Sequence, residues 1–525
     1  MINIFGVLSR LEKTIFTGAL IVTAVSAMIL TALALENNTI EIASRGGSLR
    51  EGLIGQPVFI NPIIPLTDAD REISRIVFSG LKDLSESIKV SDSGRIWTVR
   101  LKENILWNDN EPLTSDDVIF TLETILNKDA HSPLYQSFQG VTAERISQLE
   151  IKFTLQSPYA FFEEEHLKKL SIIPKHIFGD LPVQNFRLSI YGLKPIGTGP
   201  YEVVSFSKDD KGIINSLYLK ANENYWKGAP NISELYFRFY KDEKELINAY
   251  NSGEINSFLL SSAEALNSSG GIDNAIKVKH ELYPLNSSRY YAVFINQALS
   301  DKALKNINVR AALSEAIDRE ALVNTVFGSY VKLVYGPTLL TTQPADKANL
   351  SVLKDLNLTI TLPEEDFLVK TGDILKTQWE AAGAIVNIVP LSLKNLQEKI
   401  LKNTDYSMIL FGNTSGESND LFSFWHSSQR FYPDQNLALY QNKKVDSLLE
   451  SYRKNLDPET RQAALKKISD AIAADIPAIF LYSPDYLYIA TPRLHGFDNT
   501  KTIGTAADRF DGIEKWYTQT RRVWE

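Results

Sequence analysis

Cysteine is absent from this 525-residue chain. A chain without cysteine has no disulfide framework, no thiolate zinc site, no cysteine nucleophile and no lipid attached through an N-terminal cysteine. An excess of positive charge is absent as well, because 55 Lys and Arg residues stand against 63 Asp and Glu, for a net charge of −8. We therefore expect no nucleic-acid partner. The remaining composition is that of an ordinary globular protein, long enough for two or more lobes.

The common motifs of catalysis and cofactor binding are also missing. The sequence has no His-Glu-x-x-His, no Gly-x-Ser-x-Gly and no Gly-x-Gly-x-x-Gly after a strand, and its six histidines show no zinc-ligand spacing. We therefore predict no catalytic residue, no metal and no cofactor. Carboxylates are plentiful, so a glycosidase-like pair of acids in a cleft stays open at this point.

One long hydrophobic run lies close to the N-terminus. Residues 14–35, TIFTGALIVTAVSAMILTALAL, carry no charge and follow Arg10 and Lys13. As a helix this run reaches about 30 Å, which is enough to cross a bilayer. The preceding positive charges place residues 1–13 in the cytoplasm and the rest of the chain outside. We favour a retained anchor over a cleaved signal peptide, although the Ala-Leu-Ala at 32–34 would suit a cleavage site.

The rest of the sequence alternates between strand-like and helix-like segments, which predicts an α/β protein. Residues 36–47 are polar and small and predict a short tether. A first strand is expected near residue 48, and amphipathic helices are expected at 68–81, 308–327 and 458–475.

The segment LTSDDVIFTLETIL, residues 113–126, contains two adjacent acids, Asp116 and Asp117. Such a pair could serve catalysis. It also lies in the first turn of a helix that Thr114 or Ser115 can cap, where carboxylates favour the positive helix end. We interpret the acids as capping residues.

The segment PIGTGPY, residues 195–201, raises a similar choice. Its glycines suggest a phosphate loop, but that motif needs a following helix and a Lys-Ser/Thr pair. Here Pro200 and a strand-like YEVVSFS follow instead. We therefore predict a tight turn that leads into a β-hairpin.

Several segments, taken in order, resemble the extracytoplasmic solute-binding proteins of peptide-type ABC importers, the oligopeptide- and dipeptide-binding group known as solute-binding protein family 5. The similarity runs from about Ser48 to about Phe497. The segments that carry it are LWNDNEPLTSDDVIFTLETI at 106–125, PIGTGPY at 195–201, KANENYWKGAPNISELYFRFY at 220–240, NVRAALSEAIDREALVNTVFG at 308–328 and FWHSSQ at 424–429.

This resemblance implies a two-lobe periplasmic-binding-protein fold of type II, in the large peptide-binding class, preceded by one N-terminal transmembrane helix. Lobe one is then expected at 48–285, with an extra subdomain at 67–170, and lobe two at 286–479. The segment 480–525 would return to lobe one. The lobes would be joined by two hinge crossings, near 289–297 and 478–485, and would close on a ligand.

The resemblance also points to ligand-binding residues in the segment 410–429. In the family an aspartate ahead of an Asp/Glu-Pro pair holds the α-ammonium of the ligand. If Asp420 takes the place of the acid in that pair, Glu417 falls at the amine-binding position, although Leu421 replaces the proline. The alternative is that Glu417 and Asp420 are two solvated acids on a polar loop.

Further candidates lie nearby. One of Phe424 and Trp425 is expected to face the cleft and the other the core, because neighbours on a strand point in opposite directions. His426 could hold a ligand carboxylate or a metal chelate, or be satisfied structurally. The remaining ligand-binding candidates are Asn413, Tyr291 and Asn296. Arg310 and Asp318 are expected to hold structure.

The function that the resemblance implies is capture of a peptide outside the membrane and its delivery to a permease and ATPase pair, without catalysis. A second interpretation keeps the fold but changes the solute to a nickel chelate, an oligosaccharide or a signalling peptide. A third is an exported hydrolase that uses Glu417 and Asp420 as an acid/base pair. Fold alone does not decide among the three.

Overall fold

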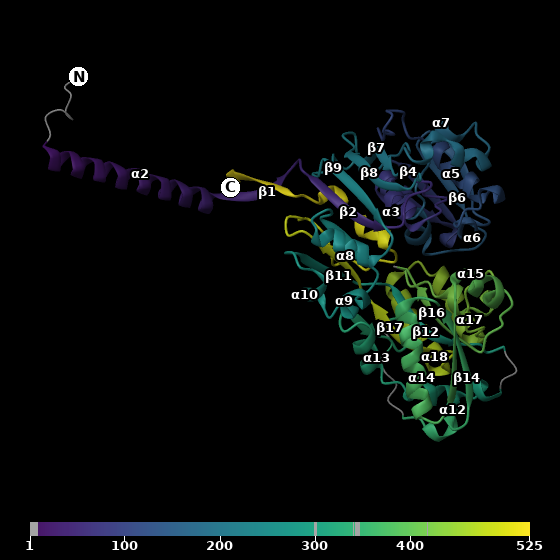
Figure 1. Ribbon diagram of the computed structural model, residues 1–525. Coiled ribbons are helices and arrows are strands. Elements are labelled where there is room, and N and C mark those ends of the chain that lie inside the picture. The colour runs from purple at the N-terminus through teal and green to yellow at the C-terminus, as the bar shows by residue number, and fades with distance from the viewer. Residues whose placement is uncertain (1–8, 299–301, 340, 342–346, 417, 525) are drawn as a thin grey trace.

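Two α/β bodies lie one above the other, and a long helix projects from the upper one (Figure 1). The structure is a computed structural model, and it describes residues 9–298, 302–339, 341, 347–416 and 418–524. The first body contains a seven-stranded and a four-stranded sheet, and the second body contains a six-stranded sheet. The mixed α/β fold predicted from the sequence is confirmed.

The seven-stranded sheet of the first body has the order β11-β18-β10-β2-β9-β8-β7, with parallel pairs around β2 and antiparallel pairs elsewhere. β7 and β8 form the hairpin expected after PIGTGPY. The strands are β2 (Ser48–Ile54), β7 (Tyr201–Lys208), β8 (Ile214–Ala221), β9 (Glu234–Tyr240), β10 (Ser257–Leu260), β11 (Glu281–Leu285) and β18 (Tyr486–Ala490).

The six-stranded sheet of the second body has the order β13-β17-β12-β16-β14-β15. Here β16, β14 and β15 are parallel neighbours, and the other pairs are antiparallel. The strands are β12 (Arg289–Ile295), β13 (Val331–Leu333), β14 (Asn357–Pro363), β15 (Ile385–Leu391), β16 (Met408–Thr414) and β17 (Ala478–Pro484).

The chain passes between these two sheets at two short crossings. Residues 286–288 link β11 to β12, and Asp485 alone separates β17 from β18. Lys332 donates to side chains of both crossings, to Asn286 and, at 3.1 Å, to Asp485. The crossings are therefore tied together.

Residues 480–484 were expected to return to lobe one. They pair within the sheet of the second body instead, while the division into two lobes stays a prediction.

A four-stranded antiparallel sheet, β3-β4-β6-β5, lies inside the region predicted as an extra subdomain. Helix α5 (Ser115–Leu126) packs against it. Thr114 caps this helix through a capping box with Asp117, whose other oxygen accepts from the Lys175 backbone amide at 2.9 Å. The interpretation of Asp117 as a capping residue is confirmed. The strands are β3 (Ser85–Ser91), β4 (Ile96–Leu101), β5 (Thr142–Ser147) and β6 (Glu150–Thr154).

The single helix expected at 308–327 is wrong, because the structure has two. α12 (Ile307–Glu315) ends at the C-cap Ala316, and Asp318 then caps α13 (Arg319–Val326) by accepting from the Ala321 amide. A short polar residue that bonds a nearby amide competes with the continuing helix. Arg310 holds structure as expected, donating to four backbone carbonyls.

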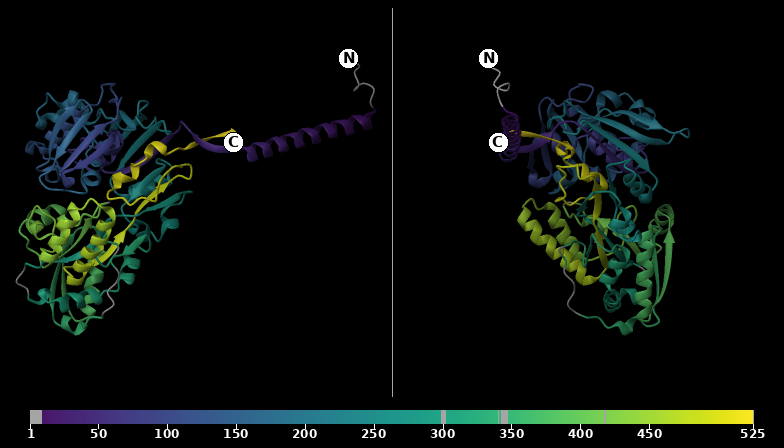
Figure 2. Two further views of the ribbon diagram at one scale, coloured as in Figure 1. Left: turned by 180° about the vertical axis from the view of Figure 1, so that it is seen from behind. Right: turned by 60° about the vertical axis from the view of Figure 1, so that its left-hand side comes forward.

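The longer helices cover the sheets, as Figures 1 and 2 show. α14 ends before Gly383, whose φ of +99° suits glycine, and β15 follows, as predicted. The helices used below are α3 (Asp68–Val77), α8 (Glu243–Asn251), α14 (Asp366–Ala381), α16 (Phe422–Trp425), α17 (Lys443–Lys454) and α18 (Pro458–Asp475).

The N-terminal helix α2 (Arg10–Asn38) stands apart from both bodies (Figure 2). Its residues 10–34 are long and apolar enough to cross a membrane and none of them is buried. The tether expected at 36–47 contains a strand instead. β1 (Thr39–Ser44) pairs antiparallel with β19 (Gln519–Trp524), a partner so distant in sequence that local composition could not reveal it.

Candidate functional site

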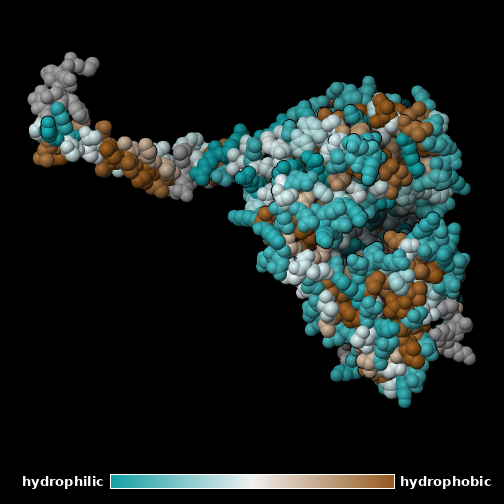
Figure 3. Space-filling view, viewed as in Figure 1, coloured by the Kyte–Doolittle hydropathy of each residue, from teal (hydrophilic) through white to brown (hydrophobic). Residues whose placement is uncertain are grey.

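A cavity of about 800 Å³ lies between the two bodies. Figure 3 shows the surface hollowed at this place. Three parts of the molecule line it. They are the first body around residues 75–83, 164–168, 200 and 225–227, the second body around 288–290, 337–339 and 415–419, and the segment 501–515. Because these parts belong to different bodies, a relative movement of the bodies changes the shape of the cavity.

The PIGTGPY segment forms part of the wall, at Pro200. A Cβ on Gly197 would lie 1.9 Å from the Val77 carbonyl oxygen, and one on Gly199 would lie 2.4 Å from that of Ile76. The glycines are therefore needed for close approach to the end of α3. Tyr201 is buried and donates to the Ile232 carbonyl at 3.0 Å. The predicted turn, rather than a phosphate loop, is what the segment forms.

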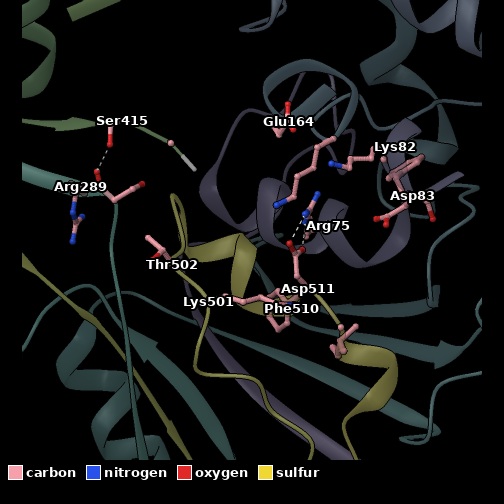
Figure 4. Close-up of a pocket in the computed structure, with 18 of the residues that line it drawn as sticks. Arg75, Lys82, Asp83, Glu164, Arg289, Ser415, Lys501, Thr502, Phe510 and Asp511 are labelled. Atoms are coloured by element: carbon pink, nitrogen blue, oxygen red, sulfur yellow. Dashed lines mark hydrogen bonds and ion pairs between the residues drawn. The ribbon is translucent and has the colours of Figure 1, made fainter. Parts of the chain in front are cut away.

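Charged side chains of both signs surround the cavity (Figure 4). Arg75 holds Asp511 through two hydrogen bonds of 2.6 and 2.8 Å. Lys82 pairs with Glu163 at 3.0 Å, and Lys227 pairs with Asp83 at 3.3 Å. Most of these charged side chains therefore have partners within the protein. A polar ligand would enter an electrostatic potential set by side chains that these pairs already hold in place.

Three residues that line the cavity each have a buried polar atom without a hydrogen-bond partner among the described residues: Glu164 Oε2, Ser288 Oγ and Arg289 Nε. Figure 4 shows Glu164 on one side of the cavity and Arg289, beside Ser415, on the other. A buried polar group without a partner costs free energy, about 1–3 kcal/mol. An acceptor on one side and donors on the other match a ligand that carries an ammonium at one end and a carboxylate at the other.

None of these three residues is distinguished by the sequence alone. Ser288 and Arg289 lie at the first crossing, within or beside the region expected for it. Glu164 lies in the run Glu163-Glu164-Glu165, where nothing in the sequence distinguishes one acid from the next.

The predicted binding loop does reach the cavity. Ser415, Gly416 and Asn419 line it, and Ser415 Oγ donates to the Ser288 carbonyl at 3.3 Å. Glu417 lies outside the described residues, so its role as the amine-binding acid stays a prediction.

Asp420 lies beside the cavity and joins the two bodies. Its Oδ2 accepts from the Tyr159 hydroxyl of the first body at 2.9 Å and pairs with Arg453 Nε of the second body at 3.0 Å. Burial and the Asp420 charge raise the pKa of Tyr159 well above its usual value. The solvated acid of the alternative interpretation is not what the structure has, since the Asp420 side chain is only 12% exposed.

A second link runs beside it. Glu165 of the first body accepts from the hydroxyl of Ser418 at 2.6 Å and from its amide at 3.3 Å. Burial acts to raise the pKa of Glu165, but Lys169 and Ser418 outweigh it and lower this pKa. We call Tyr159, Glu165, Ser418 and Asp420 the rim contact, because they join the bodies at the edge of the cavity.

Phe424 and Trp425 were expected on a strand, and that expectation is wrong. They lie on the short helix α16, so they do not alternate between two faces of a sheet. Trp425 is fully buried against Phe294 and Phe480, and Phe424 is half-buried. Neither is among the residues that line the cavity.

His426 stacks on Phe422, with ring centroids 4.0 Å apart, and its Nδ1 lies 2.8 Å from Ser428 Oγ. Its Nε2 lies 3.4 Å from Glu450. His426 is not among the residues that line the cavity, and its predicted contact with ligand stays a prediction. Among the described residues no group of three or more His, Asp or Glu is arranged to hold a metal ion.

The three remaining candidates lie on or next to β12 and β16. Tyr291 is buried between Phe367 and Tyr482. Asn296 donates to two backbone carbonyls, and Asn413 donates to the Tyr290 hydroxyl at 3.4 Å. None of the three is among the lining residues, and their predicted contact with ligand stays a prediction.

Known proteins are similar to this chain in sequence and in structure. A sequence model described as "Bacterial extracellular solute-binding proteins, family 5 Middle" matches residues 82–432. The oligopeptide-binding protein AppA from Bacillus subtilis is 26% identical over 522 residues, covering 90% of this chain and 92% of AppA. Its structure in complex with a nonapeptide superimposes with a TM-score of 0.70 at 23% identity, covering 91% of this chain and 99% of that one.

Two further solved structures are similar. The ABC transporter substrate-binding protein CtaP from Listeria monocytogenes has a TM-score of 0.77 at 26% identity, covering 91% of this chain and all of that chain. NikZ from Campylobacter jejuni, in complex with Ni(L-His), has a TM-score of 0.70 at 23% identity, covering 90% and 99%.

Proposed function

Because the chain belongs to family 5 of the bacterial extracellular solute-binding proteins, we propose that it is the peptide-binding receptor of an ABC importer. It captures a peptide outside the membrane, between its two bodies, and delivers it to a permease and ATPase pair. The similarity to the oligopeptide-binding protein AppA supports a peptide as the solute. The observation that carries the proposal is the cavity between the bodies, with unpaired buried groups of opposite character on its two sides.

The receptor works without catalysis in this proposal. An acid/base pair of Glu417 and Asp420 would need a carboxylate free to exchange protons with substrate. Asp420 is instead engaged by Tyr159 and Arg453. Residues 14–35 are retained as an anchor, which keeps the receptor beside its permease.

A second solute class has one specific observation in its favour. The likeness to NikZ, whose structure holds Ni(L-His), makes a nickel chelate of an amino acid the alternative solute on the same fold.

We expect the protein, purified at full length in detergent from a native-like host, to carry peptides. Mild denaturation followed by mass spectrometry would release them at close to one per protein. Added peptides of the same length would then raise the unfolding midpoint, because a ligand that binds only the folded state stabilises it. A released nickel chelate would favour the alternative, and turnover of added peptides to product would contradict the binding role.

Glu164 is proposed to receive the ligand's ammonium group, since its Oε2 is buried at the cavity without a partner. We expect Glu164→Gln to weaken binding of a peptide with a free amine about tenfold, because a hydrogen bond between charged groups contributes about 1.5–3 kcal/mol. Binding of the N-acetylated peptide would change little. Isothermal titration calorimetry with both peptides measures the difference.

Glu163→Gln is the matched control, because Glu163 is adjacent in sequence but pairs with Lys82 and is not among the lining residues. We expect it to preserve the preference for a free amine. Equal losses for the free and the acetylated peptide in Glu164→Gln would show that Glu164 does not bind the ammonium.

A further inference from the structure

The ribbon formed by β1 and β19 has an apolar end and a polar end. In its register Thr39 faces Trp524 and Ile40 faces Val523, whereas Ala43 faces Thr520 and Ser44 faces Gln519. Trp524 is 67% exposed and Ile40 is 47% exposed. The polar end joins the first body, so the apolar end is the one that points away from it, towards α2 (Figure 1).

The apolar end lies directly after α2, because Asn38 is the last residue of the helix and Thr39 is the first of β1. The uncharged run of α2 ends at Leu35. Thr39 therefore lies about 6 Å beyond it, at 1.5 Å per helical residue. The polar headgroup layer on each side of a bilayer is about 5–8 Å thick. A membrane that holds residues 14–35 would thus have its headgroup layer at the level of Thr39.

The strand pairing then places Trp524 at the level of the headgroup layer too, because Trp524 is the direct partner of Thr39. Tryptophan favours this layer, because its ring is apolar and its N–H is polar. The other tryptophans are buried or half-buried; Trp97, Trp107, Trp379, Trp425 and Trp516 are 4% exposed or less. Trp524 is thus the described tryptophan that presents most of its surface outward.

We propose that the tip of the β1–β19 ribbon, formed by Ile40, Val523 and Trp524, is a second membrane contact that rests in the lipid headgroup layer beside α2. The inference rests on the proposed retention of residues 14–35 as an anchor. The occupant of the exposed face is lipid, since the tip is covalently continuous with a helix that is apolar and wholly exposed. Glu41 and Arg522 pair with each other on the ribbon at 3.4 Å, so they add no net charge behind the tip.

The contact fixes the receptor more firmly than one helix alone. A single helix leaves the body free to swivel about the helix axis. Two attachment points, α2 and the ribbon tip, set the direction in which the first body leaves the membrane. Figures 1 and 2 show helix and ribbon following one another as an extended arm.

The test uses the full chain reconstituted in nanodiscs that contain phosphatidylcholine and phosphatidylglycerol. Some lipids carry bromine either near the headgroup end or near the tail end of the acyl chains. The emission of Trp524 is obtained as the difference between the wild type and Trp524→Phe. We expect this difference emission to be blue-shifted and quenched by the shallow bromines more than by the deep ones or by acrylamide.

Two further variants test whether the quenching depends on the position of the ribbon tip. Insertion of four helical residues after Asn38 lifts the tip by about 6 Å, and the shallow quenching is then expected to be lost. Ile190→Trp in the Trp524→Phe background is the matched control, because Ile190 is 82% exposed on the first body and far from the ribbon in sequence. Its emission is expected to respond to acrylamide and not to brominated lipid.

Two outcomes would overturn the inference. Quenching of Trp524 by acrylamide alone would place the tip in water, and quenching by neither agent would place it against protein, such as a second copy of the chain. Since the reconstituted chain keeps its helix, these outcomes are independent of processing in the cell. Intact mass of the protein extracted from native membranes tests the retention of residues 14–35 separately.

Discussion

Gly197→Ala lowers the free energy of unfolding by about 3 kcal/mol, the upper part of the range for overpacked sites. The added methyl carbon would lie 1.9 Å from the carbonyl oxygen of Val77 and 2.8 Å from its carbonyl carbon. Both atoms belong to the backbone, so no change of rotamer relieves the clash. The turn would have to move away from α3 and break the bond from the Gly199 amide to the Val77 carbonyl, which is 2.8 Å long.

Chemical denaturation followed by circular dichroism measures this loss. Gly504→Ala is the matched control, because its added Cβ would meet nothing closer than 3.5 Å and its φ is not positive. We expect the control to change stability by less than about 0.5 kcal/mol, as for substitutions that leave packing and buried bonds intact. If Gly197→Ala were as mild as the control, close approach would not explain the glycines of PIGTGPY.

Asp420→Ala weakens ligand binding about 100-fold. Its carboxylate accepts the Tyr159 hydroxyl across the rim contact and holds Arg453 beside it. Two bodies that close on a ligand form such bonds only when they come together. Asp420→Ala removes this charge-assisted bond and also releases Arg453, whose guanidinium lies 4.6 Å from the Tyr159 ring across the same contact. Together these losses cost about 3 kcal/mol, which is about two decades in Kd. Calorimetry with a peptide recovered from the native protein provides the measurement.

Tyr159→Phe tests the contact between the bodies without disturbing the structure of the second body. It removes the bond between the bodies and leaves the Asp420–Arg453 pair intact, so we expect a loss of about tenfold. Tyr201→Phe removes a buried hydroxyl bond that lies within the first body, and it is expected to lower stability without changing affinity. Unchanged affinity in both Asp420→Ala and Tyr159→Phe would contradict a role of the rim contact in closure.

The fold could be predicted from the sequence wherever local pattern and resemblance agreed. The cap at Thr114, the hairpin after Pro200 and the helix–glycine–strand step at Gly383 are all local, because each depends on residues a few positions apart. The ribbon of β1 and β19 was not predictable in this way. Its strands stabilise each other from opposite parts of the sequence, and neither strand alone signals the pairing.

The site was harder to predict, for a physical reason. Resemblance led to the loop around Asp420, and the structure brings that loop to the cavity edge. Which side chains face the cavity, however, depends on the local backbone. The strand predicted at Phe424 and Trp425 is the short helix α16, and of the two it is Trp425 that lies in the core. Glu164 could be distinguished from Glu163 and Glu165 only once the partners of all three were known.

The pairing of β1 with β19 also constrains the order of events during export. Thr39 and Trp524 meet although 485 residues separate them in the chain. β1 is synthesised before all the other described strands and β19 after them, so the ribbon is the last of the described sheets that can form. Until then an unpaired segment links the growing domain to α2, and with residues 14–35 retained as proposed the domain would fold without restraint from the bilayer. Only a chain that has reached β19 therefore gains this paired, more rigid link between α2 and the first body.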